Sequence, residues 1–405
     1  MENKSLKPKI RFKGFTEAWE QRKFSDVGCV SMCKRIFKTQ TTDIGEVPFF
    51  KIGTFGKTAD SYITKKLFNE YKAKFSYPEK GDILISASGS IGRIVEFSGK
   101  DEYFQDSNIV WLKHNKEISN EFLKQLYQIV KWYGIEGTTI QRLYNSNILN
   151  TEFKMPSIDE QNKISSLLNC IDNLITLHQR KCDKLVNIKK SLLEKMFPKN
   201  GNNVPEIRFK GFTEAWEQRK VTDVGKIFIG LVTTMTKNYT DVGTLLIRNS
   251  DIKDNHFEFD SNPIHLDEGF AKLNDSRRMH IGDVVTVHTG DVGTSAVITE
   301  KEDGSIGFAT IVTRPNKEII DSNYLSTYLN TEQHKNWAIN QSTGDGRTNY
   351  NLKEFTQLIV PLPSLKEQQC ISKYIKQIDN LITLHQKKLN KLKNIKKSLL
   401  DKMFV

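Results

Sequence analysis

One segment of the chain occurs twice without a single change. Residues 10–23 read IRFKGFTEAWEQRK, and residues 207–220 repeat them at every position. Two further pairs follow in the same order with one substitution each, namely 171–181 with 378–388 and 187–197 with 394–404. A repeat of this kind is the sequence sign of a duplicated structural unit. Because the chain has 405 residues, two domains of ordinary size fit the duplication.

The two halves differ mainly between the repeated segments. The offset is 197 between Ile10 and Ile207 and has grown to 207 between Ile171 and Ile378. Insertions therefore accumulate in the stretches between repeats, which predicts variable domains alternating with repeated helices. The predicted division is a first variable domain at 1–157, a helix at 158–198, a second variable domain at 199–363 and a second helix at 364–405.

The repeated helices carry apolar residues three and four positions apart, which is typical of a coiled-coil seam. From Ile164 the seam runs through Leu168, Ile171, Ile175, His178, Cys182, Leu185, Leu192 and Met196. Its twin runs through Ile371, Ile375, Ile378, Ile382, His385, Leu389, Leu399 and Met403. Lys189 interrupts the first seam. We expect the two helices to pair antiparallel, and the alternative is that each packs on its own domain. We interpret the two histidines as buried and partnered rather than as metal ligands.

The variable domains read as mixed α/β. Short β-branched runs predict strands at 49–55, 81–88, 108–114, 244–250, 282–289 and 309–315. A short amphipathic helix is predicted to begin at Ser119 in the first half and at Ser322 in the second. The predicted fold class is α+β, with two mixed α/β domains separated by a long two-helix antiparallel coiled coil.

The net charge of +12 favours a polyanionic partner, because lysine and arginine gain free energy by releasing counterions from phosphates. No stretch approaches the roughly 20 apolar residues that a membrane helix needs. The five cysteines are odd in number and irregularly spaced, which fits a reducing compartment rather than a disulfide framework. We therefore expect a soluble, cytoplasmic, DNA-binding protein.

The sequence offers no convincing catalytic motif. A base-modifying methyltransferase needs a Pro-Pro turn and a glycine-rich cofactor loop, but the chain has no Pro-Pro pair, and residues 89–93 lack the glycine spacing. Residues 53–58 resemble only the end of a phosphate-binding loop. Cys29 and Cys33 have no second pair of ligands nearby. We therefore predict no catalytic residue, no metal site and no cofactor for this chain.

Three loops at matching places in the two halves place glycines beside arginine, asparagine, glutamine, serine, threonine or histidine. Such side chains contact phosphates and base edges, although ordinary turns on a sheet are the alternative. The candidate DNA-binding residues of the first half are Lys34, Arg35, Lys57, Ser88, Ser90, Arg93, Gln141, Arg142 and Asn145. Those of the second half are Arg248, Asn249, Lys253, Arg277, Arg278, His288, Thr289, Thr294, Arg347, Asn349 and Tyr350.

Identical segments are expected to meet the same surface twice, whereas unlike loops are expected to meet two different surfaces. One asymmetric DNA site and two copies of one protein partner satisfy both conditions. A recent duplication without functional meaning is the alternative. The candidate partner-binding residues on the helices are Ile171, Leu174, Leu185, Leu192, Ile378, Leu381, Leu392 and Leu399.

The layout resembles the specificity (S) subunit of type I restriction-modification systems over nearly the whole chain. The resemblance is carried by the doubled FKGFTEAWEQRK, by GDILISASGSIG and GDVVTVHTGDVG, by MPSIDEQNKI and LPSLKEQQCI, and by NIKKSLLEKMF with its twin. It implies two target-recognition domains that each bind one half of a split sequence. It also implies two methyltransferase subunits, which use S-adenosylmethionine to methylate adenine, and restriction subunits. The chain itself would be non-catalytic. The competing hypothesis is a coiled-coil protein scaffold with incidental positive charge.

Overall fold

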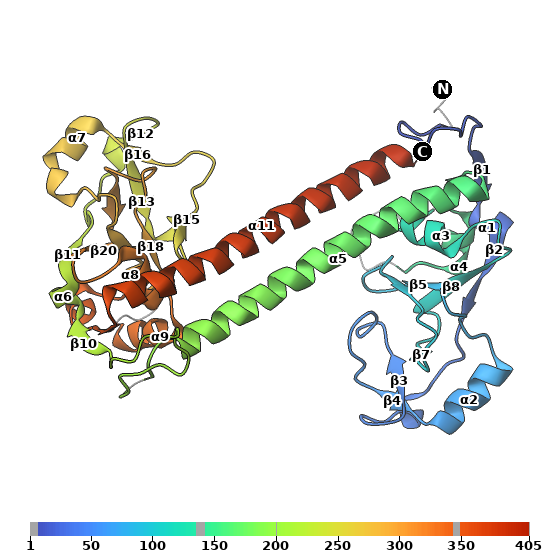
Figure 1. Ribbon diagram of the computed structural model, residues 1–405. Coiled ribbons are helices and arrows are strands. Elements are labelled where there is room, and N and C mark those ends of the chain that lie inside the picture. Colours follow the sequence, from blue (N-terminus) through green and yellow to red (C-terminus); the bar gives the residue numbers. More distant parts are fainter. Residues whose placement is uncertain (1–6, 135–141, 200, 343–348, 405) are drawn as a thin grey trace. The chain divides into compact units, whose positions relative to one another are not determined.

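The structure is a computed structural model that describes residues 7–134, 142–199, 201–342 and 349–404 (Figure 1). It divides into two compact units, one formed by Met1–His178 with Lys387–Val405 and the other by Gln179–Gln386. The division falls within two long helices, α5 (Ile158–Lys195) and α11 (Leu365–Met403). Each unit therefore contains one mixed α/β domain and part of both helices. The four-segment division of the sequence follows domains rather than compact units and stays a prediction.

Unit 1 is built on an antiparallel four-stranded sheet and a smaller three-stranded sheet. The larger has the order β2 (Gly28–Met32), β8 (Ile109–His114), β5 (Ile83–Ser86) and β6 (Ile94–Glu96). The smaller has the order β4 (Tyr62–Ile63), β3 (Val47–Phe50) and β7 (Tyr103–Phe104), and β1 (Glu20–Lys23) pairs with β9 (Glu152–Met155). The helices are α1 (Phe24–Val27), η1 (Lys38–Gln40), α2 (Lys65–Lys74), α3 (Asn120–Leu126) and α4 (Asn145–Asn150).

Unit 2 repeats this plan with additions. One four-stranded sheet has the order β11 (Gly225–Ile229), β20 (Ile311–Pro315), β17 (Val284–Thr286) and β18 (Ser295–Val297). The other has the order β12 (Tyr239–Thr240), β16 (His265–Leu266), β13 (Thr244–Arg248) and β19 (Ile306–Phe308). Two strand pairs complete it, β10 (Glu217–Lys220) with β21 (Ile359–Leu362) and β14 (Ile252–Lys253) with β15 (His256–Phe257). The helices are α6 (Val221–Val224), η2 (Thr236–Asn238), η3 (Asn249–Asp251), α7 (Glu268–Leu273), η4 (Asp275–Arg277), α8 (Ser322–Leu329), α9 (Glu332–Gln341) and α10 (Leu352–Phe355).

The predicted strands are present but shorter than the apolar runs. The run at 81–88 forms β5 only from Ile83, because Gly81 turns the chain at a φ of 95°. Ser119 caps α3 as predicted, accepting a hydrogen bond from the Phe122 amide. The second helix, α8, begins at Ser322 as predicted, and the preceding Asp321 caps it by accepting a hydrogen bond from the Tyr324 amide. These adjustments leave the predicted mixed α/β class confirmed.

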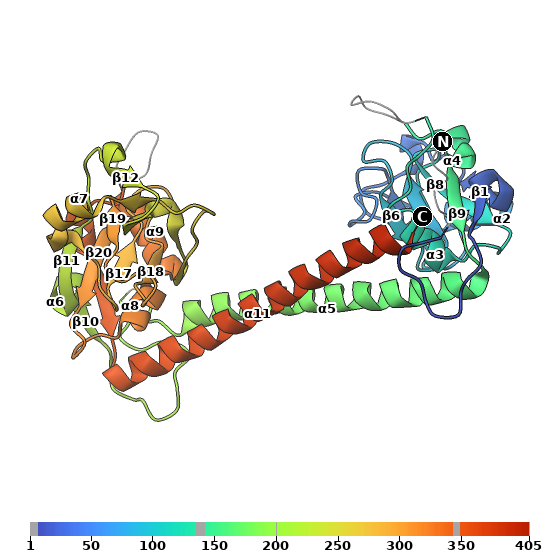
Figure 2. The same cartoon turned by 90° about the horizontal axis from the view of Figure 1, so that it is seen from above.

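The fourteen-residue segment closes unit 1 by joining the two long helices. Arg11 forms two hydrogen bonds with Glu160, at 2.6 and 2.8 Å, near the start of α5. The Trp19 indole donates to the same carboxylate at 3.2 Å. The Ile10 amide donates to the Lys402 carbonyl oxygen at the end of α11. Figure 2 shows the N-terminal end of the chain near the C-terminal end of this helix. The segment therefore binds the beginning of one repeated helix and the end of the other.

The second copy repeats two of these three contacts in unit 2, whereas the Trp216 indole nitrogen has no hydrogen-bond partner among the described residues. Arg208 binds Glu367 near the start of α11 at 2.7 and 2.8 Å, and the Ile207 amide donates to the Lys195 carbonyl oxygen at the end of α5. The fourteen residues thus meet surfaces of their own chain that are themselves repeated. This internal contact gives a physical reason for their identity that needs no external partner.

The long helices pair antiparallel within each unit. In unit 1, Lys396 of α11 forms an ion pair with Asp172 of α5 at 2.6 Å. In unit 2, Lys189 of α5 forms an ion pair with Asp379 of α11, also at 2.6 Å. Lys189 and Lys396 are equivalent in the repeat, as are Asp172 and Asp379. The apparent lapse in the seam is therefore a repeated, half-buried ion pair, which favours one antiparallel register.

The seam also extends into the cores of both recognition folds. Leu168 of α5 and Leu400 of α11 belong to the apolar core of unit 1, and Met196 and Ile371 belong to that of unit 2. The helices therefore pack both on each other and on the domains, so the two alternatives from the sequence are combined. The seam histidines, His178 and His385, are half-buried, and neither lacks a partner.

Candidate nucleic-acid interface

The predicted loops of the first half meet in unit 1. The Ile52 amide donates to the Gln105 side chain at 2.9 Å, and the Ser88 hydroxyl donates to the Asn108 side chain at 2.8 Å. Arg142 donates to the Ser107 carbonyl oxygen at 3.3 Å. We name residues 51–57, 86–93, 105–108 and 142–145 the first loop cluster. It combines segments that lie up to about 90 residues apart in the chain.

The predicted loops of the second half meet in the same way in unit 2. The Asn249 side chain accepts from the His288 amide at 2.9 Å and donates to the Ala309 carbonyl oxygen at 3.2 Å. The Thr289 hydroxyl donates to the Asn349 side chain at 3.0 Å. We name residues 248–253, 288–294, 307–310 and 349–351 the second loop cluster. Matching loops therefore converge on matching places of two related scaffolds.

The cationic candidates of the first cluster are largely accessible. Lys57 and Arg142 are exposed, and Arg35 lies beside the cluster with 67% of its side chain exposed. The Arg142 guanidinium also lies over the Tyr144 ring, which is 61% exposed. An arginine stacked on an exposed tyrosine offers both a charge and a flat apolar face, the two features that bind a nucleic acid backbone and its bases.

The other candidates of the first half vary in accessibility. Ser90 is exposed in a loop and Asn145 is exposed at the start of α4, whereas Ser88 is held by Asn108. Arg93 is half-buried and donates to the Phe55 carbonyl oxygen at 2.9 Å, so it shapes the loop at 51–57. The Lys34 ammonium lies over the Phe75 ring. Gln141 lies outside the described residues.

Two cationic candidates of unit 2, Arg248 and Arg278, are engaged by acidic side chains. Arg248 binds Asp251 and Asp260 at 2.7 and 2.9 Å, and hydrogen bonding to Asp251 and Asp260 raises the pKa of Arg248. Arg278 binds Glu268 and Asp275 at 2.7 and 3.0 Å. These ion pairs hold loops together within the domain. They leave the second cluster dominated by neutral polar groups.

The remaining candidates of the second half have mixed environments. Arg277 donates to the Ile229 carbonyl oxygen at 2.6 Å, and Lys253 donates to that of Ser250 at 2.8 Å. Burial lowers the pKa of the half-buried His288. Thr294 and Tyr350 are buried, so we remove both from the set of DNA contacts, because a side chain enclosed by protein cannot reach a base. Arg347 lies outside the described residues.

Tyr350 instead supports the second cluster from within the domain core. Its amide donates to the His288 carbonyl oxygen at 2.8 Å, and its hydroxyl lies 3.3 Å from Nε2 of His334. Nδ1 of His334 lies 2.6 Å from the Leu329 carbonyl oxygen, which assigns the ring proton to Nδ1. Nε2 of neutral His334 therefore accepts a hydrogen bond from the Tyr350 hydroxyl, and this pair positions the loop that carries His288.

Unit 2 should lose stability in mild acid because of His334. Burial lowers the pKa of this histidine to about 4, from an unfolded value of 6.5. Below pH 6.5 the His334 imidazole is protonated in the unfolded chain but stays neutral in the folded chain. The free energy of unfolding therefore falls from pH 6.5 down to about 4, by up to roughly 3 kcal/mol. Urea unfolding of wild type and His334→Gln, followed by hydrogen exchange of unit 2, measures the difference. A wild-type slope equal to that of His334→Gln would contradict the assignment, and His280→Gln, at an exposed histidine, is the control.

Two short turns at the centre of the clusters were missed from the sequence. They are Gln105–Asn108 and Gly307–Thr310, and each contains a residue with a φ of 49°, Ser107 in the first and Ala309 in the second. The pairs Ser107-Asn108 and Ala309-Thr310 do not signal a left-handed conformation, because serine and alanine have no strong preference for it. An alignment of the halves around the strands that follow, β8 and β20, would have shown only that the turns correspond.

The described residues contain no group of three or more histidine, cysteine, aspartate or glutamate side chains that could hold a metal ion. Within the same ranges, no helix is both long and apolar enough to cross a membrane.

Comparison with known proteins decides the family. The family described as type I restriction modification DNA specificity domain matches residues 16–187 and 213–394, one match for each half. The chain belongs to this family. Its members are specificity components rather than catalysts, so the family gives the chain a non-catalytic role in a type I restriction-modification system.

Individual relatives agree with this family. A putative type I restriction enzyme specificity subunit of Haemophilus influenzae is 55% identical over 150 residues, which span 37% of this chain and 39% of that protein. A putative type I restriction enzyme specificity subunit of Methanocaldococcus jannaschii is 26% identical over 340 residues, covering 79% of this chain and 77% of the relative.

Solved structures share the fold. The S subunit of the type I restriction-modification system from M. genitalium matches with a TM-score of 0.59 and 16% identity over 99% of both chains. A structure described in terms of complex assembly and conformational transition of the type I system matches with a TM-score of 0.54 and 17% identity, over 95% of this chain and 97% of the other. At these identities the likeness concerns the fold alone.

Proposed function

We propose that this specificity subunit reads a split, asymmetric DNA site, with one loop cluster for each half. The observation that carries the proposal is that two related scaffolds bring matching loops together and furnish them with different side chains. A shared scaffold predicts the same mode of docking on DNA, and unlike loops predict unlike sequences. Two modest interfaces in one chain then act as one selective interface, because the second contact is intramolecular.

The chemistry of the clusters supports two different half-sites. Exposed Arg142 and Lys57, with Arg35 beside them, suit phosphate contacts and guanine recognition at the first cluster. Asn349, Thr289 and His288 in the second cluster suit neutral hydrogen bonding, of the kind that reads adenine or either base of a pair. The first domain is therefore expected to contribute more of the salt-dependent affinity.

The proposal includes partners that carry out the chemistry. Two methyltransferase subunits, using S-adenosylmethionine to methylate adenine, and restriction subunits would assemble on this non-catalytic chain in the cytoplasm. The long helices would fix the separation of the half-sites, because they run from one recognition domain to the next in the chain. The family membership and the doubled helices support this assignment.

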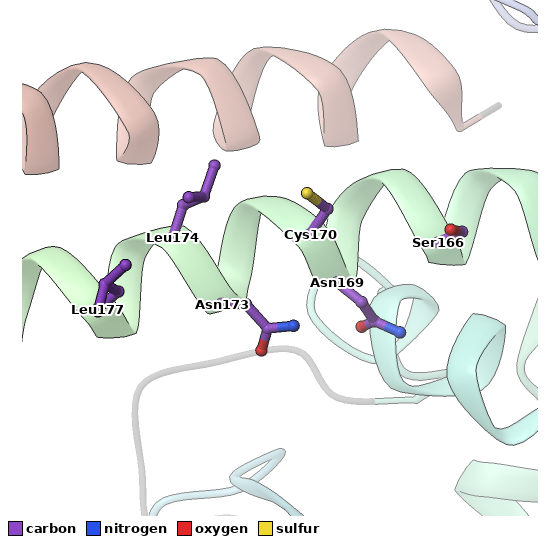
Figure 3. A pocket seen from close by; sticks show the side chains of 6 residues that line it. All are labelled: Ser166, Asn169, Cys170, Asn173, Leu174 and Leu177. Carbon is purple, nitrogen blue, oxygen red and sulfur yellow. The ribbon is translucent and has the colours of Figure 1, made fainter.

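An exposed apolar stripe on each long helix is the surface that suits a repeated protein partner. Leu174 and its twin Leu381 are 39% and 44% exposed, and Leu177 and Leu384 are both 46% exposed. On α5 these leucines line an open pocket, with Cys170 and Leu174 on one side of the helix and Asn169 and Asn173 on the other (Figure 3). Exposed leucines at identical places of a duplicated helix indicate one partner bound twice.

The other candidate partner residues face inward. Ile171 and Ile378 are buried between the helices, and Leu192 and Leu399 pack on the cores of units 2 and 1. Leu185 and Leu392 are half-buried. We therefore propose Leu174 and Leu381, with Leu177 and Leu384, as the contacts that a methyltransferase subunit makes.

Charged substitutions on this stripe should remove the partners one at a time. Leu174→Asp is expected to lose one methyltransferase subunit and Leu381→Asp the other, each with affinity reduced roughly 30-fold or more, because a central apolar contact becomes an unpaired buried charge. Native mass spectrometry of the assembled complex counts the subunits. Thr176→Asp and Thr383→Asp, on the opposite face, are the matched controls. Full occupancy in the double leucine variant would exclude this surface.

The decisive test of the proposed function is a domain exchange. Residues 24–155 are replaced by the corresponding region of a relative, and methylated adenines are mapped genome-wide in cells that supply the partner methyltransferase. We expect one half-site to change while the other and the spacer stay the same. A change in both halves would refute the modular assignment. For the alternative of a protein scaffold, purified complexes should bind DNA with little dependence on salt, whereas the proposal requires a steep decrease.

A further inference from the structure

The two turns missed from the sequence occupy the centre of their clusters. We name Gln105–Asn108 the first central turn and Gly307–Thr310 the second. Each holds a non-glycine residue in the left-handed region at the same φ of 49°, with one residue between it and the strand that follows. Such a conformation is unfavourable for serine and alanine, so it persists only where surrounding contacts impose it, and it concentrates at functional sites.

Hydrogen bonds from three neighbouring loops hold the conformation of the first central turn. Gln105 binds the Ile52 amide, and the Asn108 carbonyl oxygen accepts from the Ala87 amide at 2.7 Å. The Ser107 carbonyl oxygen accepts from Arg142. One residue of this turn takes no part in these bonds: Asp106, whose nearest cation is Arg35 at 3.8 Å.

The second central turn is held in an equivalent way. The Ala309 amide donates to the Leu231 carbonyl oxygen at 2.8 Å, and the Asn249 side chain donates to the carbonyl oxygens of both Phe308 and Ala309. A Cβ at Gly307 would collide with the Thr310 side chain, so the close approach of these two residues leaves no room for a side chain at position 307. The Phe308 side chain projects from it and is 36% exposed, whereas Ile306 and Ile311 on either side are fully buried.

Asp106 and Phe308 thus hold one position, immediately before the left-handed residue, at the centre of each cluster. Their chemistry suits bases rather than phosphates. A carboxylate is repelled by phosphate but accepts a hydrogen bond from the amino group of cytosine, and a phenyl ring makes apolar contact with the methyl group of thymine. Arg35 and Arg142 beside the first turn offset the repulsion between Asp106 and the DNA backbone.

We propose that Asp106 and Phe308 are specificity-determining residues, Asp106 for a cytosine in the first half-site and Phe308 for a thymine in the second. The inference rests on the proposed function and assigns to each half-site one base that the predicted loops do not account for. It also explains why both domains keep a strained turn in the middle of otherwise different loops.

Asp106→Asn tests the first assignment. The amide keeps the size of the side chain but presents a donor to the cytosine amino group, and it favours adenine. In the mapping of methylated adenines, we expect one position of the first half-site to change from cytosine to adenine or to relax, with the second half-site unchanged. The matched control is Asp101→Asn in the same domain, where the carboxylate is exposed and paired with Lys65 and Lys72.

Phe308→Ala tests the second assignment. One thymine of the second half-site should lose its preference by about 10- to 100-fold, with the first half-site unchanged. Leu273→Ala, at an apolar side chain of α7 that is 86% exposed, is the control for loss of apolar surface. A site identical to that of the wild type in either variant would overturn the corresponding assignment.

If no methylated adenine is found in cells that carry a variant, its DNA affinity is measured with the purified complex. Competitor duplexes carry each possible base pair at each position of the wild-type site. Loss of discrimination at one position supports the proposal, and uniform weakening at all positions overturns it. Failure of the proposed function looks different, because the wild-type complex would then show no sequence preference at all.

Discussion

Glu160→Ala is expected to destabilise unit 1 by roughly 3 to 5 kcal/mol, because it leaves a buried charge without its partner. The Glu160 carboxylate is 1% exposed and binds Arg11, whose side chain is 13% exposed, as well as the Trp19 indole. Removal of the carboxylate leaves both donors unsatisfied at the point where the fourteen-residue segment meets α5. Hydrogen exchange measured by mass spectrometry, peptide by peptide, reports the loss within unit 1.

The duplication provides a matched comparison for this prediction. Glu367→Ala removes the equivalent carboxylate in unit 2, but the Trp216 indole nitrogen has no hydrogen-bond partner among the described residues. We therefore expect the Glu160 variant to cost about 1 kcal/mol more than the Glu367 variant. Glu20→Ala, which breaks an exposed pair with Arg22, should cost less than about 1 kcal/mol. Equal and small effects in all three variants would contradict a structural role for the repeated segment.

The double variant Leu400→Ala and Met403→Ala should destabilise the recognition fold at the opposite end of the sequence. Both side chains are buried in the same core as Trp19, Phe122 and Ile164. Large-to-small changes in a core typically cost about 2 to 5 kcal/mol each, so we expect at least about 4 kcal/mol in total. Protection against hydrogen exchange should fall across residues 24–155 and stay unchanged across residues 221–360.

The equivalent change in unit 2 is the control. Leu193→Ala with Met196→Ala should produce the reverse pattern, because Met196 is buried in the core of unit 2 and Leu193 packs on that core. Loss of protection in both units from either double variant would mean that the two cores are not separate. Loss in neither would mean that the helix ends do not support the cores.

The repeat and the seam could be predicted from sequence because both are periodic signals. The apolar spacing from Ile164 sufficed to predict a long helix and an antiparallel pair. The spacing could not show the role of Lys189. Its partner, the Asp379 carboxylate, lies far along the chain and contacts Lys189 only after the helices pair. The position of the loops was predictable for a similar reason, since matching strands in the two halves end at matching places.

The chemistry of the candidate site was less predictable. Arg248 and Arg278 look like free cations in the sequence, but Asp260 and Glu268 engage them through contacts that only the fold creates. Tyr350 looks like a base-stacking ring, but His334 and Trp337 of α9 enclose it. The central turns gave no signal, because their conformation is imposed by neighbours rather than by their own residues.

The closure of unit 1 by Leu400 and Met403 has a consequence for the order of events during synthesis. All residues of unit 2 are synthesised before Lys387–Val405, the segment that completes unit 1. The core of the first domain must therefore stay incomplete until Leu400 and Met403 are available to pack into it. A chain truncated after Gln386 should contain a finished second domain and an unfinished first one.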